Sequence, residues 1–258
     1  MASVHARAVS GLPELRAGED LAALIASASA AAGVELRDGQ LVVIAHKAVS
    51  KCEGAVVALA DVQPSERARE LAAAAAAAGQ QRDPRAIQVA LDESSEILRS
   101  ERGVLICRTR HGFVCANAGV DASNASAPDT VIVLPRDPDG SARRIRARLR
   151  ECSGAQVAVL ITDSFGRAWR HGQLDTAIGL AGMQPLDDWR GRTDVRGLEL
   201  QATWLAVADA AAAAAELARA KDSREPVVLI EGLERYCTAE DGPGAAALLR
   251  PPAEDLFL

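Results

Sequence analysis

One stretch decides how this chain is organised: residues 157–183, which read VAVLITDSFGRAWRHGQLDTAIGLAGM. It opens as a buried strand, with five apolar residues among its first six positions. The apolar run then gives way to Asp163, Ser164 and a glycine turn at Gly166. A strand that ends in a carboxylate, a hydroxyl and a glycine is a place where α/β proteins commonly hold a metal ion or a phosphate. We therefore predict a functional site at the end of this strand; the plainer alternative is a polar turn with surface arginines.

The composition outside this stretch excludes several classes of function. The 258 residues are enough for one large domain or two small ones, and the net charge of −6 argues against broad binding to nucleic acid or to anionic membranes. No apolar run of about 18 residues marks a membrane span, and the N-terminus lacks the apolar core of a signal peptide. The five cysteines contain no C-x-x-C pair, so we expect reduced thiols in a cytoplasmic protein and no zinc site.

Strands and helices alternate along the chain, but one hairpin is antiparallel. We therefore predict a mixed α/β or α+β fold with largely antiparallel sheets. Neither G-x-G-x-x-G nor a Walker A pattern is present, which speaks against Rossmann and P-loop folds. We expect one domain over residues 1–242, in one or two interwoven lobes, and a loosely attached tail over 243–258. The expected strands are 7–9, 41–45, 103–108, 113–116, 131–134 and 227–230, and the expected helices are 19–32, 64–78, 83–98, 142–150 (with Ser141 as its N-cap) and 201–219.

A second chemical segment, HKAVSKCEG, follows directly after the buried strand at 41–45. Lys47 and Lys51 lie four residues apart, with Ser50 between them and Gly54 after them. Two ammonium groups and a hydroxyl can bind phosphate oxygens. The alternative is a solvated face with two ordinary surface lysines.

A third segment, NAGVDASN, follows the second strand of the predicted hairpin. Asp121 and Asn124 offer hard oxygen ligands in a short loop, which suit Mg²⁺ or Mn²⁺ far better than zinc. The alternative is an Asx turn, in which such side chains bind their own backbone.

The expected helix at 142–150 carries five arginines. They fall around the helix rather than on one stripe, so a solvated helix is favoured over a nucleic-acid-binding one.

Four segments together resemble the coenzyme F-420-0:L-glutamate ligase family, which attaches glutamate to a deazaflavin coenzyme precursor. The resemblance covers the chain from about residue 9 to residue 231, and the last two motifs are long and specific. The segments are GLPEL (11–15), IAHKAVSKCEG (44–54), GFVCANAGVDASN (112–124) and TDSFGRAWRHGQLDTAIG (162–179).

The resemblance implies a GTP-dependent amide ligase. The family activates a terminal carboxylate of its substrate as an acyl phosphate, which the amine of L-glutamate attacks to give the amide, GDP and phosphate. It further implies two Mg²⁺ or Mn²⁺ ions, K⁺ as a further cation, and a homodimer of an unusual α+β fold.

The resemblance also implies roles for particular residues. Asp121, Asp163 and Ser164 correspond to metal ligands. Arg167 and Arg170 are our own candidates for binding the substrate phosphodiester or the glutamate carboxylates, because arginine binds both in a bidentate manner. The residues that correspond to nucleotide contacts are Leu12, Pro13, Glu14, Leu15, His46, Lys51 and Asn124, with Lys51 also expected to act in catalysis.

Some positions depart from the family pattern. His46 stands where the family usually has Ser or Thr, Ser164 replaces the commoner Thr, and Ala220 replaces a glycine of the nucleotide loop. Leu174 and Thr176 also differ from the usual residues. These departures leave a second hypothesis open, a related nucleotide-dependent amide ligase with another carboxylate acceptor. A non-catalytic nucleotide-binding protein on the same scaffold is a third hypothesis, which the presence of both acids and Lys51 disfavours.

Overall fold

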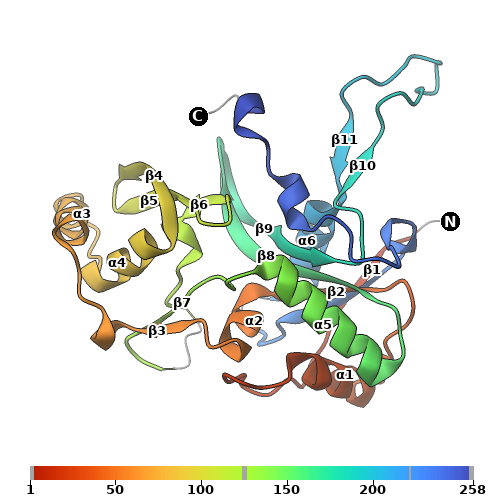
Figure 1. Cartoon of the computed structure of the whole chain (residues 1–258), viewed down its shortest axis with the longest axis horizontal. Coiled ribbons are helices and arrows are strands. Elements are labelled where there is room, and N and C mark those ends of the chain that lie inside the picture. The colour runs from red at the N-terminus through yellow and green to blue at the C-terminus, as the bar shows by residue number, and fades with distance from the viewer. Residues whose placement is uncertain (1–2, 124–126, 221, 256–258) are drawn as a thin grey trace.

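The computed structural model describes residues 3–123, 127–220 and 222–255, and its centre is a five-stranded sheet (Figure 1). The strand order is β1-β12-β2-β8-β9, in which the pair β2 and β8 is parallel and the other pairs are antiparallel. The five strands are β1 (His5–Ala8), β12 (Val227–Glu231), β2 (Leu41–Ala45), β8 (Ala158–Arg167) and β9 (Arg170–Ala181).

Helices cover both faces of this sheet (Figure 1). Helices α1 (Leu21–Ala31) and α5 (Pro138–Ser153) pack on one face, and α6 (Val207–Ala218) packs on the other. Successive residues of a strand point to opposite faces, so a strand buried on both sides reads as a continuous apolar run. This is why the apolar run of β2 predicts the strand with its observed bounds.

The alanine-rich sequence of α6 suits its place against the sheet. Its buried alanines recur at helical spacing and form one stripe of small side chains. The helix begins at Val207 rather than at residue 201, as we expected from the sequence. The three preceding residues instead form β11 (Trp204–Ala206), which pairs with β10 (Leu186–Asp188) at the base of an arm that projects from the body (Figure 1).

Helix α5 begins at Pro138, and the expectation that Ser141 caps it is wrong. The N-cap is Asp137, whose Oδ1 accepts a hydrogen bond of 2.9 Å from the backbone N–H of Gly140. Proline at the first helical position has its φ angle already set for a helix, which favours this earlier start. Gly179 of β9 allows the start of α5 to pack closely, because a Cβ atom there would lie 2.5 Å from the carbonyl oxygen of Pro138.

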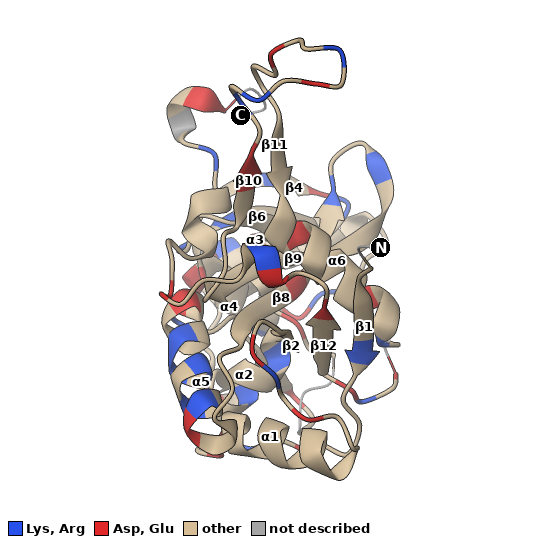
Figure 2. Ribbon diagram, turned by 90° about the vertical axis from the view of Figure 1, so that its right-hand side faces the viewer, with Lys and Arg blue, Asp and Glu red and all other residues tan. Residues whose placement is uncertain are grey.

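The arginines of α5 lie mainly along its outer face (Figure 2). Arg144 forms an ion pair with Glu53, and Arg148 forms ion pairs with Asp20 and Glu151. These ion pairs give both arginines partners within the chain.

A second group of elements has its own small core and lies beside the main sheet (Figure 1). The predicted helix over 83–98 is too long: α4 ends at Asp92, and residues 94–101 form a strand that pairs with β5. The predicted antiparallel hairpin is confirmed. The elements of this group are α3 (Glu66–Ala77), α4 (Pro84–Asp92), β4 (Ser94–Glu101), β5 (Val104–Thr109) and β6 (Val114–Ala116).

The two groups are joined by the antiparallel pair β3 (Val56–Ala58) and β7 (Thr130–Ile132). The prediction of an α+β fold with largely antiparallel sheets is confirmed. None of the helices in the described ranges is long and apolar enough to cross a membrane. The remaining elements are α2 (His46–Cys52) and the short 3₁₀ helices η1 (Leu59–Asp61), η2 (Asn117–Gly119), η3 (Glu234–Tyr236), η4 (Ala245–Leu248) and η5 (Pro252–Glu254).

The segment after residue 242 is anchored at its start. Ala245 is fully buried, and its backbone N–H donates a hydrogen bond of 2.8 Å to Oδ1 of Asp139. The division of the chain into a domain over 1–242 and a tail over 243–258 remains a prediction.

Candidate active site

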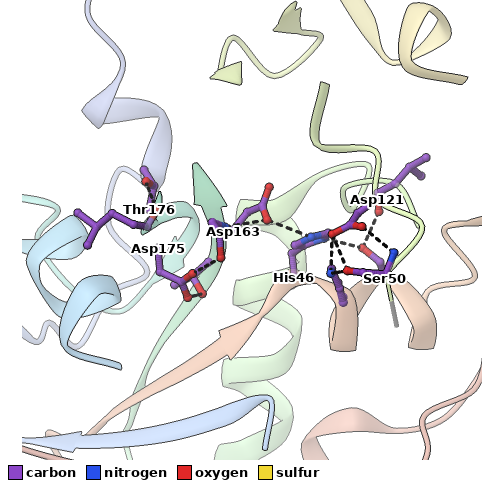
Figure 3. A network of polar contacts seen from close by, with 12 residues as sticks. His46, Ser50, Asp121, Asp163, Asp175 and Thr176 are labelled. Atoms are coloured by element: carbon purple, nitrogen blue, oxygen red, sulfur yellow. Dashed lines mark hydrogen bonds and ion pairs between the residues drawn. The ribbon is translucent and has the colours of Figure 1, made fainter. Parts of the chain in front are cut away.

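The parallel pairing of β2 and β8 brings two predicted site residues together. Ala45 is in register with Thr162, so the next residues, His46 and Asp163, lie side by side where β2 ends and α2 begins (Figure 3). Nε2 of His46 lies 3.3 Å from Oδ1 of Asp163, and the two side chains are 2% and 16% exposed. The carboxyl ends of parallel strands are common positions for binding sites, and at this one His46 is buried while the carboxylate of Asp163 stays partly accessible.

Strand β8 does not end in a glycine turn at Gly166, as we expected. It continues to Arg167, and Gly166 pairs with Gln173 of β9. The chain reverses beyond Arg167, where Trp169 adopts a positive φ of 58°. Asp163 and Ser164 therefore lie within a long hairpin rather than in a loop, which holds both residues on a rigid element.

Asp121 reaches the same region from the second group of elements. Its backbone pairs with Ile132, with N–H to O distances of 3.0 and 2.8 Å, which fixes the position of the residue. Lys47 Nζ donates to Oδ2 of Asp121 at 2.6 Å and to Oγ of Ser123 at 2.6 Å. In Figure 3, Asp121 and Asp163 appear on either side of His46.

The pKa of Asp121 lies below its usual value. Partial burial acts to raise this pKa, but the hydrogen bonds from Lys47 and from the backbone and hydroxyl of Ser123 outweigh that effect. The carboxylate is thus kept ionised and able to bind a cation.

Ser164 is held by Asp175, a residue of β9 that we did not predict as part of the site. The Ser164 hydroxyl donates a hydrogen bond of 2.6 Å to Oδ1 of Asp175, and its backbone N–H donates one of 2.8 Å to Oδ1 of Asp163. A hydroxyl that donates its hydrogen in this way still has oxygen lone pairs to offer a cation. Asp175 therefore orients the Ser164 oxygen.

The charge of Asp175 is buried and compensated. Its side chain is 3% exposed and pairs with the guanidinium of Arg219, which is 11% exposed and lies at the end of α6. Thr162 Oγ1 donates to Oδ2 of Asp175 at 2.9 Å, and Arg219 also donates to Thr162 Oγ1 and to the carbonyl oxygen of Pro226, each at 2.9 Å. A buried ion pair needs such additional hydrogen bonds to offset the loss of solvation.

Lys51 lies one helical turn after Lys47 on α2 and contacts a different segment. Its Nζ donates a hydrogen bond of 2.6 Å to Oε1 of Glu14, and its side chain is 11% exposed. The segment that carries Glu14 is anchored by the buried Leu15, with Leu12 half-buried and Pro13 exposed. The structure thus joins Lys51 to the segment 12–15, while the predicted contact Asn124 lies outside the described residues.

The structure places Arg167 and Arg170 away from this centre. They pair with each other across the end of the β8–β9 hairpin, both are exposed, and Arg167 donates a hydrogen bond of 2.6 Å to the carbonyl oxygen of His171. Arg167 lies four residue steps beyond Asp163 on β8, which corresponds to about 13 Å along an extended strand. Their role in substrate binding remains a prediction.

The oxygen atoms gathered here suit a hard divalent cation. The carboxylates of Asp121 and Asp163 and the hydroxyl of Ser164 are the type of donor that Mg²⁺ and Mn²⁺ prefer. Within the described ranges, however, no group of three or more His, Cys, Asp or Glu side chains is placed to hold a metal ion. Asp121 is engaged by Lys47, so holding one cation together with Asp163 requires Asp121 to exchange this ion pair for the cation.

Comparison with known proteins covers nearly the whole chain. The model of the F420-0:Gamma-glutamyl ligase family matches residues 11–232. The coenzyme F420:L-glutamate ligase of Methanothermobacter thermautotrophicus is 42% identical over 250 residues, which are 96% of each chain. The protein of the same name from Methanopyrus kandleri is 44% identical over 246 residues, covering 95% of this chain and 93% of its own. That from Halobacterium salinarum is 41% identical over 257 residues, covering 96% and 97%.

Proposed function

Because this chain belongs to the F420-0:gamma-glutamyl ligase family, we propose that it is a ligase that adds L-glutamate to coenzyme F-420-0 at the expense of GTP. The observation that carries the proposal is the identity of 41–44% to coenzyme F420:L-glutamate ligases over almost the full length of both chains. The substrates are the deazaflavin coenzyme precursor, L-glutamate and GTP.

The proposed reaction has two steps. An oxygen of the terminal carboxylate of the coenzyme precursor attacks the γ-phosphorus of GTP, which releases GDP and gives an acyl phosphate. The amine of L-glutamate then attacks the acyl carbon, loses a proton, and displaces inorganic phosphate to leave the amide. Activation is needed because a carboxylate oxygen is a poor leaving group, whereas phosphate is a good one.

The residues of this chain divide this work between them. Asp121, Asp163 and Ser164 would hold the cations, Mg²⁺ or Mn²⁺, whose charge stabilises the transferring phosphoryl group when they are bound. Lys51 and the segment 12–15 would position the nucleotide, as would His46 and Asn124. Asp175 holds the Ser164 hydroxyl in place.

The exposed arginines at the end of the β8–β9 hairpin would bind the acidic parts of the other substrates. Arg167 and Arg170 each offer a planar guanidinium that matches a phosphodiester or a carboxylate. Their position beyond Asp163 along the same hairpin would align a long acceptor with the phosphoryl-transfer centre.

The proposed enzyme is a homodimer of the cytoplasm that also uses K⁺. Exposed apolar side chains near the β10–β11 arm support a partner subunit, since Leu198 is 66% exposed and Trp204 is 49% exposed. Side chains of this kind are commonly covered by an interface.

The test is a reaction of the purified protein with F-420-0, L-glutamate, Mn²⁺ and GTP, followed by mass spectrometry of the products. We expect products that have gained one or more glutamyl units, and we expect Asp163→Ala to abolish them. Asp92→Ala, at an exposed position on α4 in the second group of elements, is the matched control and should retain the reaction. A folded protein that binds GTP but glutamylates nothing would contradict the proposal and favour another carboxylate acceptor.

A further inference from the structure

His46, which the proposed function places at the nucleotide, carries a buried nitrogen atom whose own partner that role does not specify. Its side chain is 2% exposed, and among the described residues Nε2 has no hydrogen-bond partner. Oδ1 of Asp163 lies 3.3 Å away, close enough for an ion pair with a protonated ring, but no hydrogen bond joins the two atoms. Buried polar atoms without a partner are rare and costly, so this one requires an explanation.

The neighbouring hydroxyl determines which ring nitrogen carries the hydrogen. Ser50 Oγ is fully buried and donates its hydrogen to the carbonyl oxygen of Val133 at 2.7 Å. Ser50 can therefore only accept from His46 Nδ1, which lies 3.4 Å away. In a neutral imidazole, a hydrogen on Nδ1 leaves the lone pair on Nε2, the nitrogen that lies beside Asp163.

In that tautomer a nitrogen lone pair and a carboxylate oxygen lie next to each other, with the nitrogen buried and the carboxylate 16% exposed. The two atoms need a positive charge between them: a proton on Nε2 would make them an ion pair, and a bound cation would be shared by both. Ligands at right angles on a cation, each bonded at about 2.1 Å, are roughly 3.0 Å apart, and tetrahedral ligands are roughly 3.4 Å apart. The observed 3.3 Å falls within this range. If both atoms bind one cation, each of them points at the cation and not at the other atom, which explains why no hydrogen bond joins them.

We propose that His46 Nε2 and Asp163 Oδ1 are neighbouring ligands of one divalent cation, so that this site contains a nitrogen donor. The inference rests on the cation dependence of the proposed function and specifies the site further. Imidazole favours transition metals, whereas Mg²⁺ prefers oxygen ligands. His46 therefore shifts the preference of the site from Mg²⁺ towards divalent transition-metal ions, a class that includes Mn²⁺ as its weakest imidazole binder.

Pulsed electron paramagnetic resonance on protein loaded with Mn²⁺ alone tests this directly. The sample is the full chain without an affinity tag, in a buffer without nitrogen ligands and without nucleotide, since guanine also offers nitrogen. We expect modulation from a directly bound ¹⁴N nucleus, which changes to the ¹⁵N pattern when the protein is labelled with ¹⁵N-histidine. His46→Ser, which restores the hydroxyl usual in the family, should remove the modulation. His5→Gln, at an exposed position on the edge strand β1, is the control and should keep it.

Calorimetry gives a second, independent measurement. His46→Ser should weaken Mn²⁺ binding by at least about tenfold, by analogy with the loss of supporting groups in metal sites. Mg²⁺ binding should change less, so the preference for Mn²⁺ over Mg²⁺ should fall. Circular dichroism confirms that the variant is folded, and His46→Gln provides a second variant in which the side-chain volume is better kept.

The outcomes separate this inference from the proposed function. Bound Mn²⁺ without nitrogen modulation in the wild type, or modulation that persists in His46→Ser, overturns the assignment of His46. If the wild type still glutamylates F-420-0 in either case, the ligase proposal stands while the inference fails. Nitrogen modulation in a protein that glutamylates no F-420-0 would support the metal ligand and contradict the proposed function.

Discussion

Replacing Arg219 by methionine is expected to lower the free energy of unfolding by about 3–5 kcal/mol, because it leaves a buried carboxylate without its counter-charge. The Asp175 side chain is 3% exposed, so water cannot solvate the charge that the guanidinium now balances. The hydroxyls of Thr162 and Ser164 would remain as its donors, at 2.9 and 2.6 Å. Two neutral hydrogen bonds compensate a buried charge only in part, which places the loss at this magnitude.

Urea denaturation followed by circular dichroism measures the loss, and thermal unfolding should show a fall in Tm on the order of 10 °C. The double variant Asp175→Asn, Arg219→Met should be more stable than Arg219→Met alone, because the uncompensated charge is gone. A double-mutant cycle gives the interaction free energy between the two residues, which separates the contribution of the ion pair from that of side-chain packing.

The control is Arg148→Met, which removes an exposed arginine paired with Asp20 on the outer face of α5. Its free energy of unfolding should stay close to that of the wild type, since exposed ion pairs contribute little. A loss below about 1 kcal/mol for Arg219→Met, or a double variant less stable than both single variants, would refute the reasoning.

Three further predictions concern substrate binding, thiol reactivity and acid stability. Arg170→Ala should raise the KM for the phosphorylated acceptor by about tenfold or more with a smaller change in kcat, and unchanged steady-state kinetics would remove Arg170 from the site. Burial raises the pKa of Cys115 to about 12, so at pH 8 a disulfide reagent should label the exposed Cys152 first and Cys115 only after unfolding; equal labelling rates in the native protein would contradict this. The lowered pKa of Asp121 stabilises the folded protein. This stabilisation is fully present above the ordinary carboxyl pKa of about 4, and it is lost as the pH falls through the lower pKa that Asp121 has in the folded protein. Lys47→Met removes the ion pair and should therefore show a smaller loss of stability between pH 6 and pH 3, measured from urea midpoints; an equal loss would argue against Lys47 as the cause.

The central strands could be predicted because burial on both faces leaves a direct mark on the sequence. The apolar run at 41–45 predicts β2 with its observed bounds, and the run from residue 157 predicts the start of β8. Strand β4 leaves no such mark: it has polar residues on both faces, many of them exposed, and it forms because β5 pairs with it. The sequence of 83–98 contains no helix-breaking residue where α4 ends, so propensity alone extends the helix too far.

The residues of the candidate site likewise fall into those that the sequence predicts and those that it does not. Asp163, Ser164 and Asp121 could be found because each follows or continues an apolar strand, which is a local signal. Asp175 and Arg219 could not, because their importance comes from a buried contact between β9 and the end of α6. The sequence does show Asp175 as an acidic residue just before the apolar run of β9. Nothing in the spacing of residues indicates that Arg219 is its partner.

The single parallel pairing in the main sheet has a consequence for how the protein is made. His46 and Asp163 are neighbours only because β2 and β8, which lie far apart along the chain, align with Ala45 opposite Thr162. A slip of one residue would bring Lys47 or Ala45 beside Asp163 and turn the strand's apolar side chains to the wrong faces. Pairings between strands that are distant along the chain are slow to form, and the site is assembled only once this pairing is made. Any ion that bridges these two side chains would bind the correctly aligned sheet in preference to its misaligned forms and thus select for the native alignment during folding.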